Sequence, residues 1–290
     1  MINLFDKYGK VFENFNLINH NTYKVECICD YFIVVDDIIK LTNLLKYLKD
    51  NNYKYFIIGN GSNIILPNYY NGVVIKLNLN EIIFNKNKVI VSASVMMPHL
   101  VNKCLDNDLT SLEWAYGIPG TIGGCVYNNA GAYNDEIANY IDEVEVLENN
   151  KIKILKRSDI EFEYRNTSLK NRDLVILKVT LKLIKGDKVE SWNLIKDRQE
   201  RRINTQPLDK HSAGSVFRNP DGDYAGRLIE EFGLKGKSIG GAKISEKHAN
   251  FIINEGNATG EDVVKLINYI KNVIKKETDI DLVLEQEIIN

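Results

Sequence analysis

Two glycine-rich loops carry the first chemical signal in this 290-residue chain. One is Gly59-Asn60-Gly61-Ser62-Asn63, which lies between two short apolar runs, and the other extends from Gly117 to Gly124. Glycine loops that follow strands expose backbone N–H groups, and such groups bind phosphate oxygens well. A single glycine is more often part of an ordinary turn. Two such loops in one strand-rich region favour a cofactor or substrate that carries phosphate.

Neither of the two commonest phosphate-binding motifs is complete. A Walker A loop would need a glycine at Glu231, five residues before the Gly236-Lys237-Ser238 tripeptide. A Rossmann fingerprint would need a third glycine at Ile64, after Gly59 and Gly61. The sequence therefore disfavours a nicotinamide-dependent Rossmann dehydrogenase, and the glycine loops need another explanation.

A second set of polar residues lies downstream, where acid–base chemistry is possible. Arg165 follows Glu163-Tyr164, Ser215 lies in the loop 213–220, His248 lies in the run 245–250, and Glu287 is near the C-terminus. Taken singly, the arginine could form a surface ion pair worth less than about 1 kcal/mol. The serine could be a turn or cap residue, the histidine structural, and the glutamate solvated. Only their combination suggests a catalytic site.

Charge and hydropathy restrict the possible partners. The chain has 37 Lys and Arg against 39 Asp and Glu, a net charge of -2, so we expect no nucleic-acid or membrane-surface partner. No apolar run approaches the roughly 20 residues that a membrane span needs. The first ten residues lack the apolar core of a signal peptide. We therefore expect a cytoplasmic protein.

Cysteine and histidine spacing gives no indication of a disulfide framework or a metal site. The four cysteines form no C-x-x-C pair, so we expect small buried hydrophobes in a reducing compartment. The four histidines are far apart and never form H-x-x-x-H, so we expect no metal cofactor. The positions are Cys27, Cys29, Cys104, Cys125, His20, His99, His211 and His248.

Hydrophobic periodicity predicts the elements that must position these residues. Helical spacing covers Asp37 to Asp50, His99 to Leu105 and Ser191 to Ile203, and Thr259 to Asp262 is a capping box that begins another helix. In the last predicted strand, Glu285 and Glu287 would face the same side, about 6–7 Å apart. The predicted strands are Tyr55 to Ile58, Val73 to Leu77, Val89 to Val95, Val144 to Leu147, Ile152 to Leu155, Leu174 to Ile184 and Leu282 to Ile289.

Together these segments resemble the UDP-N-acetylenolpyruvoylglucosamine reductase (MurB) family of bacterial cell-wall synthesis. The resemblance is carried by GNGSNIIL (59–66), LEWAYGIPGTIGGCVYNNAGAYN (112–134), EYRNTSLK (163–170), the run from 213 to 263, and LEQEII (284–289), in family order. Only fifty positions separate Arg165 from Ser215. This resembles the shorter form of the family, which lacks an extra tyrosine-bearing loop.

The match is weaker near the N-terminus. The family pattern there is T-[TS]-F-R-x-G-G-P-A, and residues 21–25, Asn-Thr-Tyr-Lys-Val, fit its first part loosely. Glu26-Cys27-Ile28-Cys29 replaces the G-G-P-A part, which leaves the local backbone path open. This departure is the one support for a flavin- or nucleotide-binding module without catalysis. Another alternative, an oxygen-using oxidase of the same fold, is opposed by residues 213–263.

The resemblance implies an α+β fold with a two-lobed FAD-binding region of the vanillyl-alcohol-oxidase (PCMH) type, followed by a C-terminal α+β substrate domain. We expect boundaries of 1–79 and 80–186 for the two lobes and 187–290 for the substrate domain, with the last strand (281–290) returning to the active site. No histidine stands beside a glycine pair, so FAD is expected to be held without a covalent link. By motif position the FAD-binding residues would be Gly59, Asn60, Gly61, Ser62, Asn63, Gly117, Ile118, Pro119, Gly120, Thr121, Gly123, Gly124, Asn129, Ala130, Gly131 and Ala132.

The reaction that the resemblance implies has two halves. NADPH gives a hydride to FAD, and reduced flavin gives a hydride to the enolpyruvyl C3 of UDP-N-acetylglucosamine enolpyruvate, which yields UDP-N-acetylmuramate. Arg165, with Glu287 beside it, would stabilise the charge on the substrate carboxylate. Ser215 would donate the proton to C2, and Glu285 would be a supporting residue.

The resemblance and the local charge also indicate residues that bind substrate. Tyr164, Asn219 and His248 fall at or beside family contact positions, and Lys210, Arg218 and Arg227 are candidate partners of the UDP diphosphate because they lie near the Ser215 loop. We expect a small-molecule substrate and a monomer or weak oligomer.

Overall fold

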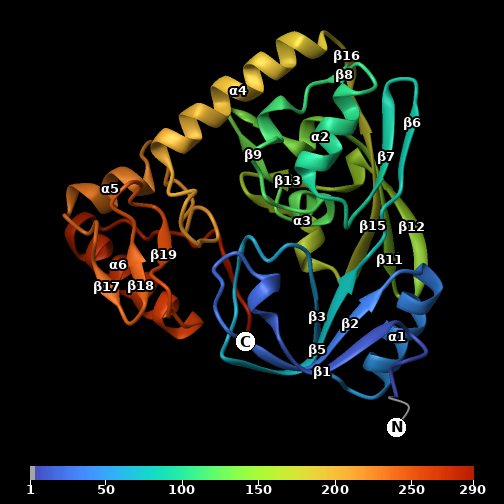
Figure 1. The fold of residues 1–290 in the computed structure, drawn as a ribbon, viewed down its shortest axis with the longest axis horizontal. Coiled ribbons are helices and arrows are strands. Elements are labelled where there is room, and N and C mark those ends of the chain that lie inside the picture. Colours follow the sequence, from blue (N-terminus) through green and yellow to red (C-terminus); the bar gives the residue numbers. More distant parts are fainter. Residues whose placement is uncertain (1–3) are drawn as a thin grey trace. The chain divides into compact units, whose positions relative to one another are not determined.

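The computed structural model describes residues 4–290, in which helices and strands both recur along the chain, as expected for an α+β fold (Figure 1). The chain divides into two compact units. Unit 1 comprises the residues up to Phe12, Phe32–Asn60 and Val74–Glu200. Unit 2 comprises Glu13–Tyr31, Gly61–Val73 and Arg201–Asn290. Each unit is therefore built from segments that are far apart in the sequence.

Unit 1 contains a five-stranded antiparallel sheet in the order β12-β11-β15-β7-β6. Successive side chains of a strand point to opposite faces, so one face can supply a core. That core includes Val89, Val91, Val144, Val179 and Leu181. Residues of α2 and α3 join the same core, and Figure 1 shows both helices beside the sheet. The bounds are β6 (Ile82–Asn85), β7 (Lys88–Ser92), α2 (Met97–Leu105), α3 (Ile122–Tyr127), β11 (Ile141–Glu148), β12 (Lys151–Lys156) and β15 (Leu174–Lys182).

Short elements connect these strands. Three two-stranded pairs form from β8 (Leu109–Thr110) with β16 (Ile184–Lys185), β9 (Gly131–Ala132) with β10 (Asp135–Glu136), and β13 (Phe162–Glu163) with β14 (Asn166–Thr167). The 3-10 turns are η1 (Leu17–His20), η2 (Glu113–Ala115), η3 (Ile137–Asn139), η4 (Arg157–Asp159) and η5 (Ser168–Asn171). The long helix α4 (Lys188–Thr205) buries only Ser191 and Ile195, which explains its highly charged sequence.

A second sheet has the order β1-β2-β5-β3, formed by β1 (Lys10–Asn16), β2 (Ile28–Val35), β5 (Tyr69–Leu77) and β3 (Tyr55–Ile58). Helix α1 (Ile38–Asp50) begins where the Asp37 carboxylate accepts from the Lys40 N–H at 2.8 Å. The atypical stretch 26–29 continues into β2 and buries Cys27 and Cys29. Burial raises the pKa of the Cys27 thiol to about 11 and that of Cys29 to about 12. All four cysteines are buried and unbonded to one another, which confirms the prediction.

Unit 2 contains the three-stranded sheet β17-β18-β19, helices α5 and α6, and a parallel pair of β4 with β20. The predicted capping box is confirmed, because Thr259 Oγ1 accepts from Asp262 N (3.1 Å) and the Asp262 carboxylate accepts from Thr259 N (3.0 Å). A Cβ on Gly260 would lie 1.8 Å from Leu66 O, so only glycine lets α6 begin this close to the segment after β4. The bounds are β4 (Ile64–Ile65), α5 (Ala225–Glu231), β17 (Ser238–Ile239), β18 (Ala242–Ile244), β19 (Ile252–Asn254), α6 (Gly260–Thr278) and β20 (Glu287–Ile288).

Three of the predicted strands are too long. The strand expected over Leu174 to Ile184 ends at Lys182, and Ile184 belongs to the separate strand β16. The strand expected to reach Val95 ends at Ser92, because the Val95 N–H turns back to Ser92 O at 3.1 Å. The strand expected over Leu282 to Ile289 is reduced to β20, because the preceding residues pair through isolated bonds instead of a regular ladder. Glu285 therefore lies outside a strand, and the expected strand spacing from Glu285 to Glu287 does not apply.

Within residues 4–290, no helix combines the length and the apolar character needed to cross a membrane. Among the same residues, no three His, Cys, Asp or Glu side chains are grouped so that they could hold a metal ion.

The end of β11 carries an ion cluster whose effect on stability depends on pH. Arg172 donates to both carboxylate oxygens of Glu148 at 2.8 and 2.9 Å, and Lys153 donates at 2.6 Å. These bonds, the arginine's first, lower the pKa of Glu148 from 4.5 to about 2. A carboxylate with a lowered folded-state pKa contributes stability above its unfolded-state pKa and loses it as the pH falls through the folded-state value.

We therefore expect Glu148→Gln to reduce the free energy of unfolding near neutral pH, with a difference from the parent that shrinks between pH 4.5 and about 2. Urea denaturation followed by circular dichroism across this range measures that difference. Glu261→Gln is the matched control, because Glu261 pairs with Lys265 at the surface, 64% exposed, where ion pairs contribute little. A Glu148→Gln difference that does not vary with pH would contradict this account.

Candidate active site

The first two residues of one glycine loop, Gly59 and Asn60, lie against the other loop within unit 1. The Asn60 side-chain amide donates to Pro119 O at 2.7 Å. A Cβ on Gly59 would lie 2.7 Å from Thr121 Oγ1, closer than real Cβ atoms approach. The close approach of this loop start to residues 119–121 thus depends on a glycine at position 59.

The backbone donors of the second loop are largely used inside the fold. Gly123 packs so closely that an added Cβ would lie 2.9 Å from Ala93 Cβ. The N–H groups of Ile122, Gly123 and Gly124 donate to Val95 O at 2.8 Å, Ala93 O at 2.8 Å and Thr121 Oγ1 at 3.3 Å. These glycines therefore allow α3 to pack closely. The N–H groups of this loop that remain candidates for binding phosphate are those of the residues before Ile122.

Asn129 connects the segment 129–132 to the turn that carries Arg165. Its side chain is fully buried, donates to Glu163 O at 2.8 Å and accepts from Ala138 N at 3.3 Å. Arg165 in turn donates through Nη2 to Gly131 O at 2.6 Å. Unit 1 thus brings together two sets of residues that the sequence selected separately.

Arg165 occupies the second position of a two-residue turn between β13 and β14. Its φ of 56° is left-handed, a conformation that costs an ordinary residue on the order of 1 kcal/mol. Its guanidinium lies 4.9 Å from the centre of the Tyr164 ring. The turn therefore holds a permanent positive charge in one orientation, as a partner of a carboxylate requires.

In unit 2, the segment that carries Ser215 is fixed from one side by residues 250–251. Ser215 bridges to Phe251 in antiparallel fashion, and Val216 N donates to Asn250 O at 2.9 Å. The buried Asn250 side chain bonds both backbone groups of Phe217, accepting at 3.0 Å and donating at 2.8 Å. Asn250, which sequence reasoning missed, therefore holds the residue two positions after Ser215.

The C-terminal segment fixes the other side of the Ser215 segment. Glu285 N donates to Val216 O at 2.8 Å, and Phe217 bridges to Leu284. Glu287 N then donates to Asn63 O at 2.9 Å, while the Asn63 side chain donates to Glu285 O at 3.1 Å. Unit 2 thus brings the predicted residues Asn63 and Glu287 and the Ser215 segment into one hydrogen-bonded arrangement.

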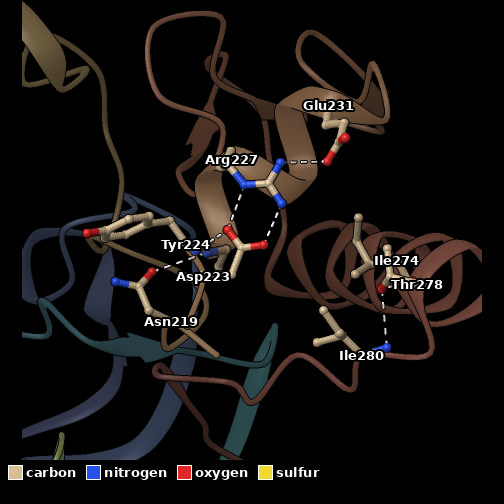
Figure 2. Close-up of polar contacts among 9 residues, drawn as sticks. Asn219, Asp223, Tyr224, Arg227, Glu231, Ile274, Thr278 and Ile280 are labelled. Atoms are coloured by element: carbon tan, nitrogen blue, oxygen red, sulfur yellow. Dashed lines mark hydrogen bonds and ion pairs between the residues drawn. The ribbon is translucent and has the colours of Figure 1, made fainter. Parts of the chain in front are cut away.

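Arg227 is bound by two carboxylates, as Figure 2 shows. Its Nε and Nη2 donate to Asp223, with the Nε bond at 2.6 Å, and its Nη1 donates to Glu231 at 2.8 Å. The arginine lowers the pKa of Asp223 to about 2. Arg227 would have to give up these bonds to bind a diphosphate, which opposes its predicted role. In the same view Asn219 accepts from Ala225 N at 3.2 Å, at the start of α5.

Arg218 has a side-chain donor without a partner and His248 is neutral, whereas Arg227 is bound by two carboxylates. Among the residues that the structure describes, the buried Arg218 Nε has no hydrogen-bond partner. A buried donor of this kind calls for an acceptor supplied by a ligand or water. Burial lowers the pKa of His248, whose Nδ1 accepts from Asn250 N at 3.2 Å. The imidazole is therefore neutral near pH 7, with its proton on Nε2.

Comparison with known proteins gives concordant matches. Residues 29–151 match the family description "FAD binding domain", and residues 206–289 match "UDP-N-acetylenolpyruvoylglucosamine reductase, C-terminal domain". The chain is similar to a curated UDP-N-acetylenolpyruvoylglucosamine reductase of Caldanaerobacter subterraneus subsp. tengcongensis, with 41% identity, over 98% of this chain and 95% of the relative. A reductase of the same name from Clostridium kluyveri is 42% identical, over 93% of this chain and 90% of the relative.

A solved structure agrees with these matches. The crystal structure of UDP-N-acetylenolpyruvylglucosamine reductase (MurB) from Thermus caldophilus has a TM-score of 0.82 and 30% identity. It covers 97% of this chain and 98% of its own. The two family ranges include both glycine loops, the Ser215 segment and Glu287.

The buried bonds of Asn129 decide between a structural and a cofactor-contacting role. We expect Asn129→Ala to lower the free energy of unfolding of the FAD-free protein by about 2 kcal/mol, because Glu163 O and Ala138 N lose their partner. Urea denaturation measures this. Asn134→Ala is the control, since Asn134 also has a left-handed φ (60° against 44°) but is exposed. Unchanged stability with loss of FAD alone would mark Asn129 as a cofactor contact.

Proposed function

Because this chain belongs to the UDP-N-acetylenolpyruvoylglucosamine reductase family, we propose that it reduces UDP-N-acetylglucosamine enolpyruvate to UDP-N-acetylmuramate, with NADPH as hydride donor and FAD as cofactor. The similarity to curated reductases over nearly the whole chain carries the proposal. The product is a precursor of peptidoglycan, so the activity serves cell-wall biogenesis and, through it, cell shape and division. An FAD-dependent oxidase is the weaker alternative, because the C-terminal domain match is specific to the reductases.

The residues of unit 1 fit an FAD cofactor. The FAD-binding match spans both glycine loops and the segment 129–132, and Asn60 and Gly59 hold the first loop against the second. Glycine at these positions lets the backbone come close to a ligand. When bound, FAD would supply the hydride chemistry between NADPH and substrate. Residues 59–63, 117–121 and 129–132 would hold it without a covalent bond.

Arg165 is assigned to the substrate carboxylate. Hydride addition at C3 of the enol ether leaves negative charge at C2, which the attached carboxylate delocalises. A fixed guanidinium near that carboxylate stabilises the charge as it develops. Gly131 O and the Tyr164 ring hold the Arg165 side chain, so little reorganisation is needed. Tyr164 is also assigned to substrate contact.

Ser215 is assigned as the proton donor to C2. A serine hydroxyl is a weak acid, so its use depends on exact placement and polarising neighbours. Pairing of its segment with residues 250–251 and 283–285 supplies the rigid placement. Glu287, whose N–H donates to Asn63 O, is assigned a role in the same reaction as Ser215 and Arg165, with Glu285 supporting it.

The remaining assignments concern substrate binding and cellular context. Asn219, Arg218 and neutral His248 are proposed to contact the substrate, with Lys210 near them; Arg227 is retained only as a weaker candidate, because two carboxylates bind it. The proposal keeps two FAD-binding lobes (1–79 and 80–186) and a substrate domain (187–290). It also includes a cytoplasmic location, where NADPH and UDP-linked sugars are found, and a monomer or weak oligomer.

An anaerobic titration tests the function directly. Purified holoenzyme is mixed with NADPH and then with UDP-N-acetylglucosamine enolpyruvate, while flavin absorbance is followed. We expect bleaching by NADPH and recovery on addition of the second substrate. Bleaching without recovery would refute the proposed substrate, and purified protein that binds no flavin would refute the cofactor.

Ser215→Ala separates the two half-reactions. We expect flavin reduction by NADPH to stay within about twofold of the parent, because no proton is delivered to C2 in that half. Reoxidation by substrate should slow by on the order of 1,000-fold, the middle of the range for loss of a general acid. Stopped-flow absorbance measures both rates. Equal loss in the two halves would exclude Ser215 as the proton donor.

Arg218 and Arg227 form a matched pair for testing the diphosphate contact. We expect Arg218→Met to raise KM for the UDP substrate by about tenfold, the effect of a lost charge-assisted hydrogen bond. Arg227→Met should change KM less than twofold, since its guanidinium is bound by Asp223 and Glu231. Steady-state kinetics with varied UDP substrate measures both; the reverse order of effects would assign the contact to Arg227.

A further inference from the structure

A buried polar residue lies between the two glutamates of the C-terminal segment. Gln286 is 3% exposed, whereas Glu285 and Glu287 are partly exposed. Its Nε2 donates to Ala213 O at 3.1 Å and to Gly214 O at 3.3 Å. Its Oε1 accepts from the Tyr23 hydroxyl at 3.0 Å. Gln286 therefore bonds the two residues that directly precede Ser215, through its own side chain.

Chemistry fixes the orientation of this amide. Carbonyl oxygens only accept hydrogen bonds, so Nε2 must face Ala213 and Gly214, and Oε1 must face Tyr23. Tyr23 is fully buried, and this burial raises the pKa of its phenol well above the ordinary value. The phenol is therefore protonated at neutral pH and donates. Each polar atom of Gln286 thus has a partner of the correct kind.

Tyr23 is itself held at its backbone. Asn254 Nδ2 donates to Tyr23 O at 2.9 Å. The buried Asn21 side chain closes the same turn, donating to Leu17 O and Val25 O at 2.9 Å each. These bonds therefore fix the backbone of the turn that carries Tyr23, and the Tyr23 hydroxyl reaches Gln286 from this fixed turn.

The Tyr23 hydroxyl is a departure from the N-terminal family pattern given above. Tyr23 stands where the T-[TS]-F-R pattern has phenylalanine, and its partner Gln286 lies between Glu285 and Glu287. A phenylalanine would leave Gln286 Oε1 without this donor in a buried place. The hydroxyl and the amide thus complement each other in this chain.

We propose that Tyr23 and Gln286 are positioning residues for substrate reduction, which hold the Ser215 segment in register with the Glu287 segment. The inference rests on the proposed function of Ser215 and Glu287. Backbone bonds from Glu285 to Val216 and from Glu287 to Asn63 align the two segments further along. The Gln286 side chain adds the link at residues 213–214, where Gly214 has a φ of 76° and would otherwise be the most adaptable point.

The energetics of a buried chain of bonds predict that the two residues act as a unit. Removing the Tyr23 hydroxyl leaves Gln286 Oε1 unpaired, and removing the Gln286 amide leaves the hydroxyl and two carbonyls unpaired. Unpaired buried groups cost more than a hydrogen bond contributes. The second substitution should therefore add little to the first.

The kinetic test uses holoenzyme carrying Tyr23→Phe, Gln286→Met or both, with stopped-flow measurement of each half-reaction. We expect flavin reoxidation by UDP-N-acetylglucosamine enolpyruvate to slow by about tenfold in each single variant, the effect of one lost buried hydrogen bond. Reduction by NADPH should stay within about twofold, and the double variant should be no slower than the worse single variant. Equal effects on both halves, no effect, or effects that multiply would each overturn the proposal.

Tyr70→Phe is the matched control, because Tyr70 is a buried tyrosine of the same unit (2% exposed) that does not bond Gln286. We expect its two half-reactions to match the parent. A tenfold loss of reoxidation in this variant as well would show that any buried hydroxyl has this effect, and would overturn the specific role of Tyr23.

Hydrogen exchange tests the link without substrate. In Tyr23→Phe, the amides of Val216, Glu285 and Glu287 should exchange faster than in the parent, while those of α6 should not change. Unchanged exchange at these amides would overturn the positioning role. Failure of the proposed function would appear separately, as parent enzyme whose reduced flavin is not reoxidised by the UDP substrate.

Discussion

The candidate site in unit 2 depends on the backbone pairing of residues 283–289 with two other segments. Val283 and Glu285 bond the residues just after Ser215, and Glu287 and Ile289 bond residues 63–65. A single short segment thus connects a predicted cofactor loop to the predicted proton donor. Backbone bonds of this kind do not depend on side-chain identity. The arrangement therefore positions Ser215 and Glu287 through their backbones.

In unit 1, a buried side chain positions the candidate residues, where unit 2 uses backbone pairing. Asn129 bonds the carbonyl of Glu163, and Gly131 accepts from Arg165, so the segment 129–136 and the Arg165 turn are linked twice. A Cβ on Gly131 would lie 2.4 Å from Asp135 O and 2.9 Å from Arg165 Nη1. Glycine is thus required there by packing within the protein. In both units, polar residues that take no direct part in the reaction fix the positions of the residues that are assigned a role in it.

The glycines illustrate how the same residue type serves different purposes. Gly59 and Gly123 allow close approach between parts of unit 1, and the donors at 122–124 are used within the fold. Gly214 has a left-handed φ and nothing near its missing Cβ, so backbone conformation alone explains it. A glycine-rich loop in the sequence indicates where backbone comes close to something. It does not tell whether that partner is a phosphate or the protein itself.

The sequence alone determined the family, because motif segments in family order are specific, and it predicted helices such as α1 and the capping box of α6 from local periodicity. It also selected Arg165, Ser215 and Glu287, whose residue types suit the chemistry. Only the tertiary structure decided that Arg227 is bound by Asp223 and Glu231, that residues 282–286 form no regular strand, and that Tyr23 and Gln286 share a buried hydrogen bond. These features arise between residues up to 263 positions apart, and local pattern contains no information on which distant groups become partners once water is excluded.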